Sequence, residues 1–243
     1  MSEQPVSEQL VKLRGLSVEH RGRKLLDGVD LDVHAGKVTA LMGPSGSGKS
    51  LTARVVLGCV DTDPGVTAGS LTYPTLSDRD WLAGRTGARG ARRLLKESRD
   101  LRGAFMTYAP QSAASALNPG RTLGRQLQLA MTRGGVPVGE QPAVLKTLLD
   151  EVGLPARAIG ALPGELSGGM CQRAALAIAV APRPRLVIAD EPETGLDPVL
   201  TRVVTELLLE LCLHRGCGLL LISHRDETVD RIADHVVRLS GGH

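Results

Sequence analysis

The sequence predicts an α/β protein built on a mostly parallel central sheet. Three short apolar runs, at 38–42, 186–189 and 219–222, have the length and composition of strands that are buried on both faces. Helical patterns lie between them, most clearly at 123–154 and 166–181. Because strands that alternate with helices form a parallel sheet with helices on both faces, we expect this fold class.

The opening of the chain predicts a separate β-rich layer. Short strands are expected at 10–14, 16–20 and 24–26, with a turn at Arg21-Gly22. The segment 29–33 alternates apolar and acidic residues, which is the period of a half-buried strand. We expect another short strand at 70–73, in a stretch rich in Gly, Pro, Thr and Asp.

The composition is that of a globular protein with an aliphatic core. The 243 residues are 42% hydrophobic and 23% charged, with only 2% aromatic residues. The net charge of +3 is too small to require nucleic acid or an anionic membrane as a partner. The four cysteines show no zinc-type spacing, so we expect reduced thiols. We expect no signal peptide and no membrane-spanning segment, since no apolar run approaches 18 residues.

A glycine-rich stretch after the first buried strand fits the phosphate-binding loop of nucleotide hydrolases. Its glycines let the backbone approach phosphate closely, and its N–H groups, together with the helix that follows, form an anion site. Lys49 is expected to reach the β- and γ-phosphates, and the Ser50 hydroxyl to bind Mg²⁺. A plain surface loop is the alternative. The residues assigned to nucleotide binding here are Gly43, Pro44, Ser45, Gly46, Ser47, Gly48, Lys49, Ser50 and Leu51.

Polar residues follow other buried strands of the same predicted sheet. Asp190 and Glu191 end one strand, His224 follows another and Gln111 a third. Because ligands of such sheets bind at the carboxyl ends of the strands, these side chains are expected to converge on the phosphate loop. Asp190 would hold Mg²⁺ and Glu191 would orient or deprotonate water, while the Gln111 amide could reach the metal or the water. A capped strand end and a structural histidine are the alternatives.

The segment 85–102 is strongly basic, with seven Arg or Lys residues against Glu97 and Asp100. It could be a nucleic-acid patch or a solvated helix face. Since no aromatic residues are interleaved for base stacking, we favour the solvated helix face.

With these motifs in place, the chain resembles the ATP-binding subunits of ABC transporters. Leu166-Ser167-Gly168-Gly169-Met170 resembles the signature motif of that family and lies between the phosphate loop and Asp190-Glu191. The resemblance covers nearly the whole chain. It implies one nucleotide-binding domain over 1–243, a P-loop NTPase of the ABC ATPase type, with an N-terminal antiparallel β layer and a helical subdomain near 112–182 inserted in a RecA-like core.

The resemblance also implies roles for further residues. Ser167, Gly168 and Gly169 would face the γ-phosphate held by another subunit, since they form a second anion site at a helix start. Asp197 would lie in the D-loop, and His224 would be the switch histidine that contacts the γ-phosphate. His20 stands where the family usually has an aromatic residue that stacks on adenine. The implied cofactors are ATP and Mg²⁺, the latter bound by Ser50, Gln111 and Asp190.

Finer features resemble the peptide and nickel importer group. They are Met170 at the end of the signature, Ala-Leu-Asn-Pro at 116–119, and Ile-Ala-Asp-Glu-Pro at 188–192. Hydrolysis of ATP would then drive uptake of an oligopeptide or of nickel or another metal chelate. The end of the sequence soon after its last strand favours a short subunit of the nickel type. Departures from the family pattern are Cys171 for Arg, Glu193 for Thr or Ser, and Gly195 for Ala.

The resemblance also implies partners and a location. We expect transmembrane permease subunits, a second identical or related ATPase subunit, indirect contact with a solute-binding protein, and no nucleic acid. The location would be the cytoplasmic face of the membrane. The alternatives are an exporter subunit and a soluble ABC protein acting on DNA or ribosomes. The segment 113–119 would border the groove for the permease, so we expect Leu117 to be exposed and Leu117→Arg to uncouple transport while leaving soluble ATPase activity largely intact.

Overall fold

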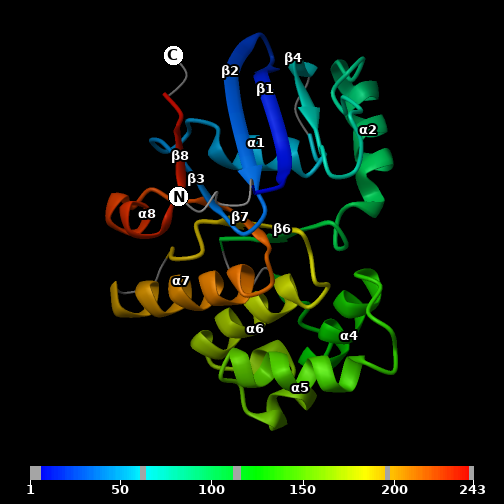
Figure 1. The fold of residues 1–243 in the computed structure, drawn as a ribbon, viewed down its shortest axis with the longest axis vertical. Coiled ribbons are helices and arrows are strands. Elements are labelled where there is room, and N and C mark those ends of the chain that lie inside the picture. Colours follow the sequence, from blue (N-terminus) through cyan, green and yellow to red (C-terminus); the bar gives the residue numbers. More distant parts are fainter. Residues whose placement is uncertain (1–6, 61–63, 112–115, 195–197, 241–243) are drawn as a thin grey trace, which may run out of the picture. The chain divides into compact units, whose positions relative to one another are not determined.

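The computed structural model describes residues 7–60, 64–111, 116–194 and 198–240. Expectations that fall on Asp197 therefore lie outside the described residues. The chain divides into two compact units, described separately below (Figure 1). None of the helices in the described part is both long and apolar enough to span a bilayer.

The first unit comprises residues 1–100 and 218–243 and contains two sets of strands. An antiparallel sheet has the order β2-β1-β4, and a parallel set has the order β7-β3-β8. The strands are β1 (Gln9–His20), β2 (Arg23–His34), β3 (Val38–Met42), β4 (Pro64–Thr72), β7 (Gly218–Ile222) and β8 (His235–Arg238). The helices are α1 (Lys49–Val56), α2 (Gly87–Glu97) and α8 (Asp226–Ile232), with the 3₁₀ turn η1 (Ser98–Asp100).

The second unit, residues 101–217, is mainly helical, with two parallel strands. The strands β5 (Met106–Ala109) and β6 (Leu186–Asp190) pair directly, and α6 packs against β5. Helix α6 also packs against α4 and α7. In Figure 1, α4 is green and α7 is orange. The helices are α4 (Leu123–Arg133), α5 (Gln141–Glu151), α6 (Gly168–Val180) and α7 (Pro198–Leu213), with the 3₁₀ turns η2 (Ala156–Gly160) and η3 (Pro163–Glu165).

The predicted fold class is confirmed. Every residue of β3, β6 and β7 is buried, as expected for short apolar runs covered on both faces. In β2, Val29, Leu31 and Val33 are buried while Asp30 is exposed, which is the predicted alternation. The free thiols expected for all four cysteines are found, since Cys59, Cys171, Cys212 and Cys217 form no disulfide.

Several strand boundaries differ from the prediction. The strands expected at 24–26 and 29–33 are one strand, β2, which runs over Arg23–His34. The two strands expected at 10–14 and 16–20 are one strand, β1, whose register with β2 shifts between Leu13 and Leu16. Gly15 lies in that irregularity with a positive φ, so the bulge interrupts the sequence pattern without ending the strand. Strand β4 runs over 64–72 rather than 70–73, because it pairs with β1 along its whole length.

The expected exposure of Leu117 is wrong. Its side chain is only 4% exposed. The adjacent Asn118 is tied to α4 by two hydrogen bonds with Gln126, one in each direction, at 2.8 and 3.1 Å. Leu117 thus faces inward and anchors this Ala- and Ser-rich stretch. An arginine at this position would bury a charge, so loss of transport in that variant could not be separated from loss of folding.

Candidate nucleotide-binding site

The loop that joins β3 to α1 requires glycine at three positions. Gly43, Gly46 and Gly48 have φ angles of 148°, 80° and 92°, which residues with a Cβ rarely adopt. Space is limited as well: a Cβ at Gly43 would lie 2.6 Å from the Leu239 carbonyl oxygen, and one at Gly48 only 2.2 Å from a methyl group of Leu26. The loop backbone is therefore closely packed from behind, while Gly46 at its tip has no neighbouring atom within 4 Å of a built Cβ.

Lys49 is folded back onto this loop. Its side chain is only 6% exposed, and its Nζ donates hydrogen bonds to the carbonyl oxygens of Gly43 at 2.9 Å and Pro44 at 3.0 Å. Both acceptors are neutral. An anion at the loop would offer the ammonium group stronger, charge-assisted hydrogen bonds.

Helix α1 begins inside the loop with its N-terminus uncapped. Gly48 is the N-cap residue and makes no side-chain hydrogen bond to the first turn, which contains no acidic residue. The first N–H groups of a helix lack partners within the helix and attract anions. Ser50 lies in this first turn and is exposed. The loop, the lysine and the helix start thus form one anion-binding arrangement.

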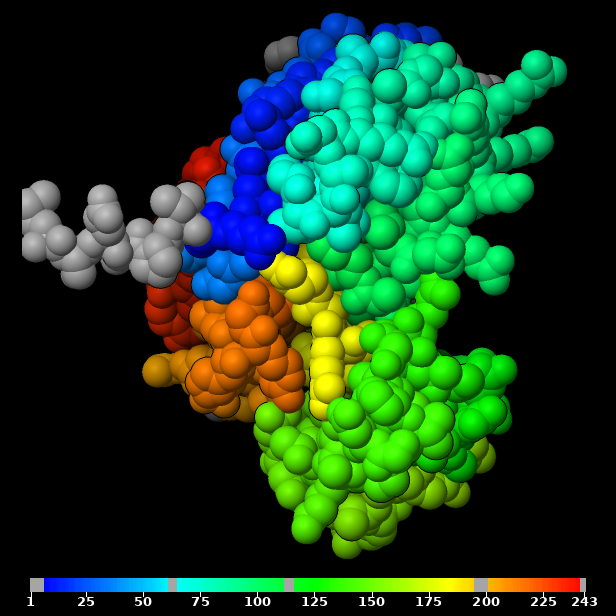
Figure 2. All heavy atoms as spheres, turned by 45° about the vertical axis from the view of Figure 1, so that its right-hand side comes forward, coloured from blue at the N-terminus to red at the C-terminus, as the bar shows by residue number. Residues whose placement is uncertain are grey.

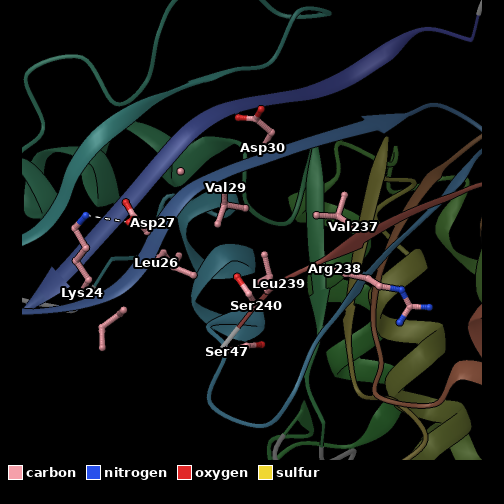
Figure 3. A pocket seen from close by; sticks show the side chains of 12 residues that line it. Lys24, Leu26, Asp27, Val29, Asp30, Ser47, Val237, Arg238, Leu239 and Ser240 are labelled. Atoms are coloured by element: carbon pink, nitrogen blue, oxygen red, sulfur yellow. Dashed lines mark hydrogen bonds and ion pairs between the residues drawn. The ribbon is translucent and has the colours of Figure 1, made fainter. Parts of the chain in front are cut away.

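A pocket of about 490 Å³ lies behind the loop, between β2 and the end of β8 (Figure 3). Leu26, Val29 and Leu239 supply much of its apolar lining. Ser47 also lines it, with a side chain that is 2% exposed and an Oγ that makes no hydrogen bond with the described residues. The Ser47 side chain therefore faces the interior, and the residue as a whole is almost completely buried.

His224 is brought to the same edge of the parallel strands as the phosphate loop. Strands β3 and β7 are parallel, with Leu41 opposite Ile222. Beyond them, the Ser223 N–H donates to the Leu41 carbonyl at 3.4 Å, and His224 follows as an exposed residue. This agrees with the expectation that both segments leave the carboxyl ends of neighbouring strands.

His20 ends β1, on the other sheet of the first unit. It is half-buried and lies opposite Arg23 across the predicted turn at Arg21-Gly22. Arg21 has a φ of 50°, so the turn is tight. The structure places His20 at a strand end beside this turn.

In the second unit, Asp190 ends β6 and is held by a tyrosine on the neighbouring strand. The Tyr108 hydroxyl donates to Asp190 Oδ2 at 2.8 Å. Asp190 is 7% exposed, so its carboxylate is fixed in one place. No group of three or more His, Cys, Asp or Glu side chains in the described ranges is arranged to hold a metal ion by itself. A hard cation would therefore need additional oxygen ligands, such as hydroxyl or phosphate oxygens.

Glu191 is the next residue and has a strained backbone. Its φ of 46° is unusual for a residue other than glycine, and such strain is concentrated at functional sites. Thr194 donates through its Oγ1 to Glu191 Oε2 at 3.0 Å, and Gln111 approaches the same oxygen through Nε2 at 3.4 Å. The structure thus brings together Gln111 and Glu191, each of which was predicted to act near the attacking water, since β5 and β6 end side by side.

The signature motif forms the start of α6. Ser167 is the N-cap, and its Oγ accepts a hydrogen bond from the Met170 N–H at 3.3 Å. Ser167, Gly168 and Gly169 are all exposed, and a built Cβ at either glycine would meet no atom within 4 Å. The backbone of this helix start is therefore accessible to a ligand or another protein. Cys171 lies one turn further, where burial raises the pKa of its thiol.

Two of these interactions were not predicted from the sequence. Tyr108 could not be linked to Asp190 because the contact depends on the register between strands that are distant in the chain. Thr194 did have a signal, since a threonine three residues after an acidic residue can hydrogen-bond back to it across a turn.

Comparison with known proteins identifies the family. The family model described as ABC transporter matches residues 26–194, more than half of the chain. The chain belongs to the ABC transporter family. The predicted resemblance is thereby confirmed.

Curated relatives of this ABC protein are ATP-binding proteins of peptide transport. It is 33% identical to the oligopeptide transport ATP-binding protein OppD of Lactococcus lactis subsp. cremoris, over 97% of this chain and 68% of that protein. It is 34% identical to the dipeptide transport ATP-binding protein DppD of Haemophilus influenzae, over 96% of this chain and 69% of that protein. Within the expected group of peptide and nickel importers, these names support the peptide importers.

Solved structures agree with the ABC cassette fold. A structure described as the ATP-binding subunit of an ABC transporter superimposes with a TM-score of 0.75 at 27% identity, covering 96% of this chain and 87% of that one. The dimeric structure of MJ0796, a bacterial ABC transporter cassette, has a TM-score of 0.72 at 24% identity, with coverages of 96% and 95%. The latter likeness supports the fold alone.

Proposed function

We propose that this ABC protein binds and hydrolyses ATP to power an importer of oligopeptides or a related small solute such as a nickel or other metal chelate. The observation that carries the proposal is the phosphate loop, in which Lys49 and an uncapped helix start face one anion site. The peptide-transport names of its relatives support the importer assignment.

Within this proposal, the phosphate loop binds the ATP phosphates through its backbone N–H groups and through Lys49, Ser50 and Leu51. The residues that would hold Mg²⁺ are Ser50, Gln111 and Asp190, whose oxygen donors suit a hard cation. When bound, Mg²⁺ would neutralise charge on the phosphates. Tyr108 keeps Asp190 oriented toward that role through its 2.8 Å hydrogen bond.

The same residues account for hydrolysis. Glu191 would accept a proton from the attacking water through a carboxylate oxygen as the bond between the γ-phosphorus and the β–γ bridging oxygen breaks. Gln111 would position that water and His224 would contact the γ-phosphate. Ser167, Gly168 and Gly169 would bind the γ-phosphate of a second subunit, with Asp197 at the contact between the two. The helical subdomain near 112–182 would carry this second anion site.

His20 is proposed to stack on the adenine ring. His20→Ala removes the ring and is expected to raise KM for ATP with little effect on kcat. Because an imidazole is a smaller stacking platform than the tyrosine ring, His20→Tyr is expected to lower KM. Steady-state ATPase kinetics of the native chain and both variants test this. Weaker ATP binding by His20→Tyr than by His20→Ala would disprove the stacking role.

Transport in reconstituted vesicles tests the importer assignment. The chain, its permease subunits and a solute-binding protein would be assembled in liposomes, with ATP supplied on the side of the ATPase. Uptake of a labelled oligopeptide or nickel chelate toward that side is expected, and it should require ATP hydrolysis. Movement of solute in the opposite direction would establish the exporter alternative. Purification with ribosomes or DNA and no permease would support a soluble role instead.

A further inference from the structure

The segment that contains α2 is strongly basic, and the exposed face of this helix carries Arg89, Arg92, Leu95 and Lys96. Residues 79–100 contain seven Arg or Lys and three Asp or Glu, an excess larger than the net charge of +3 of the whole chain. We propose that this face docks on the anionic headgroups of a lipid bilayer.

Glu97, at the end of α2, neutralises part of this charge and links the helix to Arg79 and Arg85 of the preceding segment. Glu97 accepts hydrogen bonds from Arg93 and Arg85, both at 2.7 Å, and also pairs with Arg79. The hydrogen bond from Arg93, followed by that from Arg79, lowers the pKa of Glu97. Arg79 also lies 4.4 Å above the ring of Trp81. Glu97 is thus already shared by three guanidinium groups.

The outer side of the helix carries cations that do not pair with Glu97 and are exposed to solvent. Arg89, Arg92 and Lys96 are exposed, and none of them forms an ion pair with any residue in the described ranges. Long side chains of the blue-green segment near residue 90 project outward in Figure 2. Their spacing along the helix places them on adjacent turns of one surface.

An exposed leucine lies within this charged face. Leu95 is 45% exposed, although its neighbour Leu94 is 1% exposed and belongs to the core. Leu95 is three residues after Arg92, so the two side chains adjoin on the helix surface. Basic residues around an apolar one are typical of helices that lie in a membrane interface, where the leucine enters the headgroup layer and the cations contact phosphate.

Lipid fits this face better than nucleic acid does. Single-stranded nucleic acid is bound by aromatic side chains on which bases stack. The aromatic residue nearest this face, Trp81, is 8% exposed and already covered by Arg79. A leucine also offers nothing to a nucleic-acid phosphate backbone, whereas it adds apolar contact with a bilayer.

Vesicle sedimentation tests the proposal. The native chain would be mixed, without nucleotide, with vesicles of phosphatidylcholine alone or with 30% phosphatidylglycerol. We expect binding only to the anionic vesicles, and a loss of roughly 100-fold in affinity for the triple variant Arg89→Gln/Arg92→Gln/Lys96→Gln, at about 1 kcal/mol per charge near the surface. The variant Leu95→Gln should bind less tightly with its charge unchanged.

Matched controls make the outcome decisive. Arg125→Gln/Lys146→Gln/Arg157→Gln removes the same charge from exposed positions of the second unit and should retain binding. Leu129→Gln, at a leucine that is 37% exposed on α4, is the control for Leu95→Gln. No binding to anionic vesicles, an equal loss in the control triple variant, or preferential binding of duplex DNA in competition with the vesicles would overturn the proposal. Since no ATP is present, none of these results bears on the ATPase assignment.

Discussion

Replacing Lys49 with alanine is expected to abolish ATP hydrolysis and to weaken ATP binding by about tenfold to a hundredfold. Lys49 is the only cationic side chain between Gly43 and Ser50. Removing it would delete a charge-assisted hydrogen bond to phosphate, worth about 1.5–3 kcal/mol. Hydrolysis should suffer more than binding, because negative charge develops on the β–γ bridging oxygen as its bond to the γ-phosphorus breaks, and the lysine would lie close to these phosphates.

Calorimetric titration with ATP-Mg measures the binding loss. Arg54→Ala is the matched control, because Arg54 lies on the same helix, is exposed, and is one turn or more from the loop. Lys49→Met preserves the apolar stem of the buried side chain and separates loss of charge from loss of packing. Since Lys49 also holds the carbonyls of Gly43 and Pro44, thermal melts must show that each variant folds. Affinity for ATP-Mg equal to that of the native chain would refute the phosphate-loop assignment.

The fold class could be predicted because a strand that is buried on both faces is apolar along its whole length. The runs that form β3, β6 and β7 are short, continuous and apolar, and each is followed by residues expected at the site. Strand β4 was underestimated because Gly65 and Gly69 weaken its pattern, and it exists by pairing with β1. The length of β4 depends on tertiary pairing, so it cannot be inferred from a short stretch of the sequence.

The candidate site was predictable as a set of residues but not as a network. The glycine spacing of the phosphate loop is imposed by backbone conformation, so the loop can be recognised from one short segment of the sequence. The Tyr108–Asp190 hydrogen bond depends on strand register, and the positive φ of Glu191 depends on the turn that follows it. The exposure expected for Leu117 is wrong because a leucine in an Ala- and Ser-rich stretch can face either way, and only its 4% exposure decides between them.

Glu191→Gln is expected to trap a closed, ATP-bound dimer. Glutamine keeps the shape of the side chain and one acceptor oxygen for Thr194, which lies 3.0 Å from Glu191 Oε2, but it cannot accept a proton from water. Hydrolysis would then stop after closure. We expect two chains placed head to tail, with each ATP between Lys49 of one chain and the Ser167 helix start of the other.

Adding Ser167→Arg should prevent this trapping, because it places bulk and a misdirected cation at the exposed helix start. Ser167→Ala is the control, because it adds neither bulk nor charge: it removes the hydroxyl that caps the Met170 N–H, at a cost of about 1 kcal/mol in helix stability, and leaves the backbone N–H groups of the helix start in place, so it should impair closure less than Ser167→Arg. Size-exclusion chromatography with light scattering would compare Glu191→Gln in ATP-Mg and ADP-Mg, alone and with a related ATPase subunit. A dimer mass with ATP-Mg only is expected. A monomer mass with ATP-Mg in both settings would exclude the ATP sandwich for this chain, because closure should depend on the γ-phosphate and Glu191→Gln removes the step that would release it.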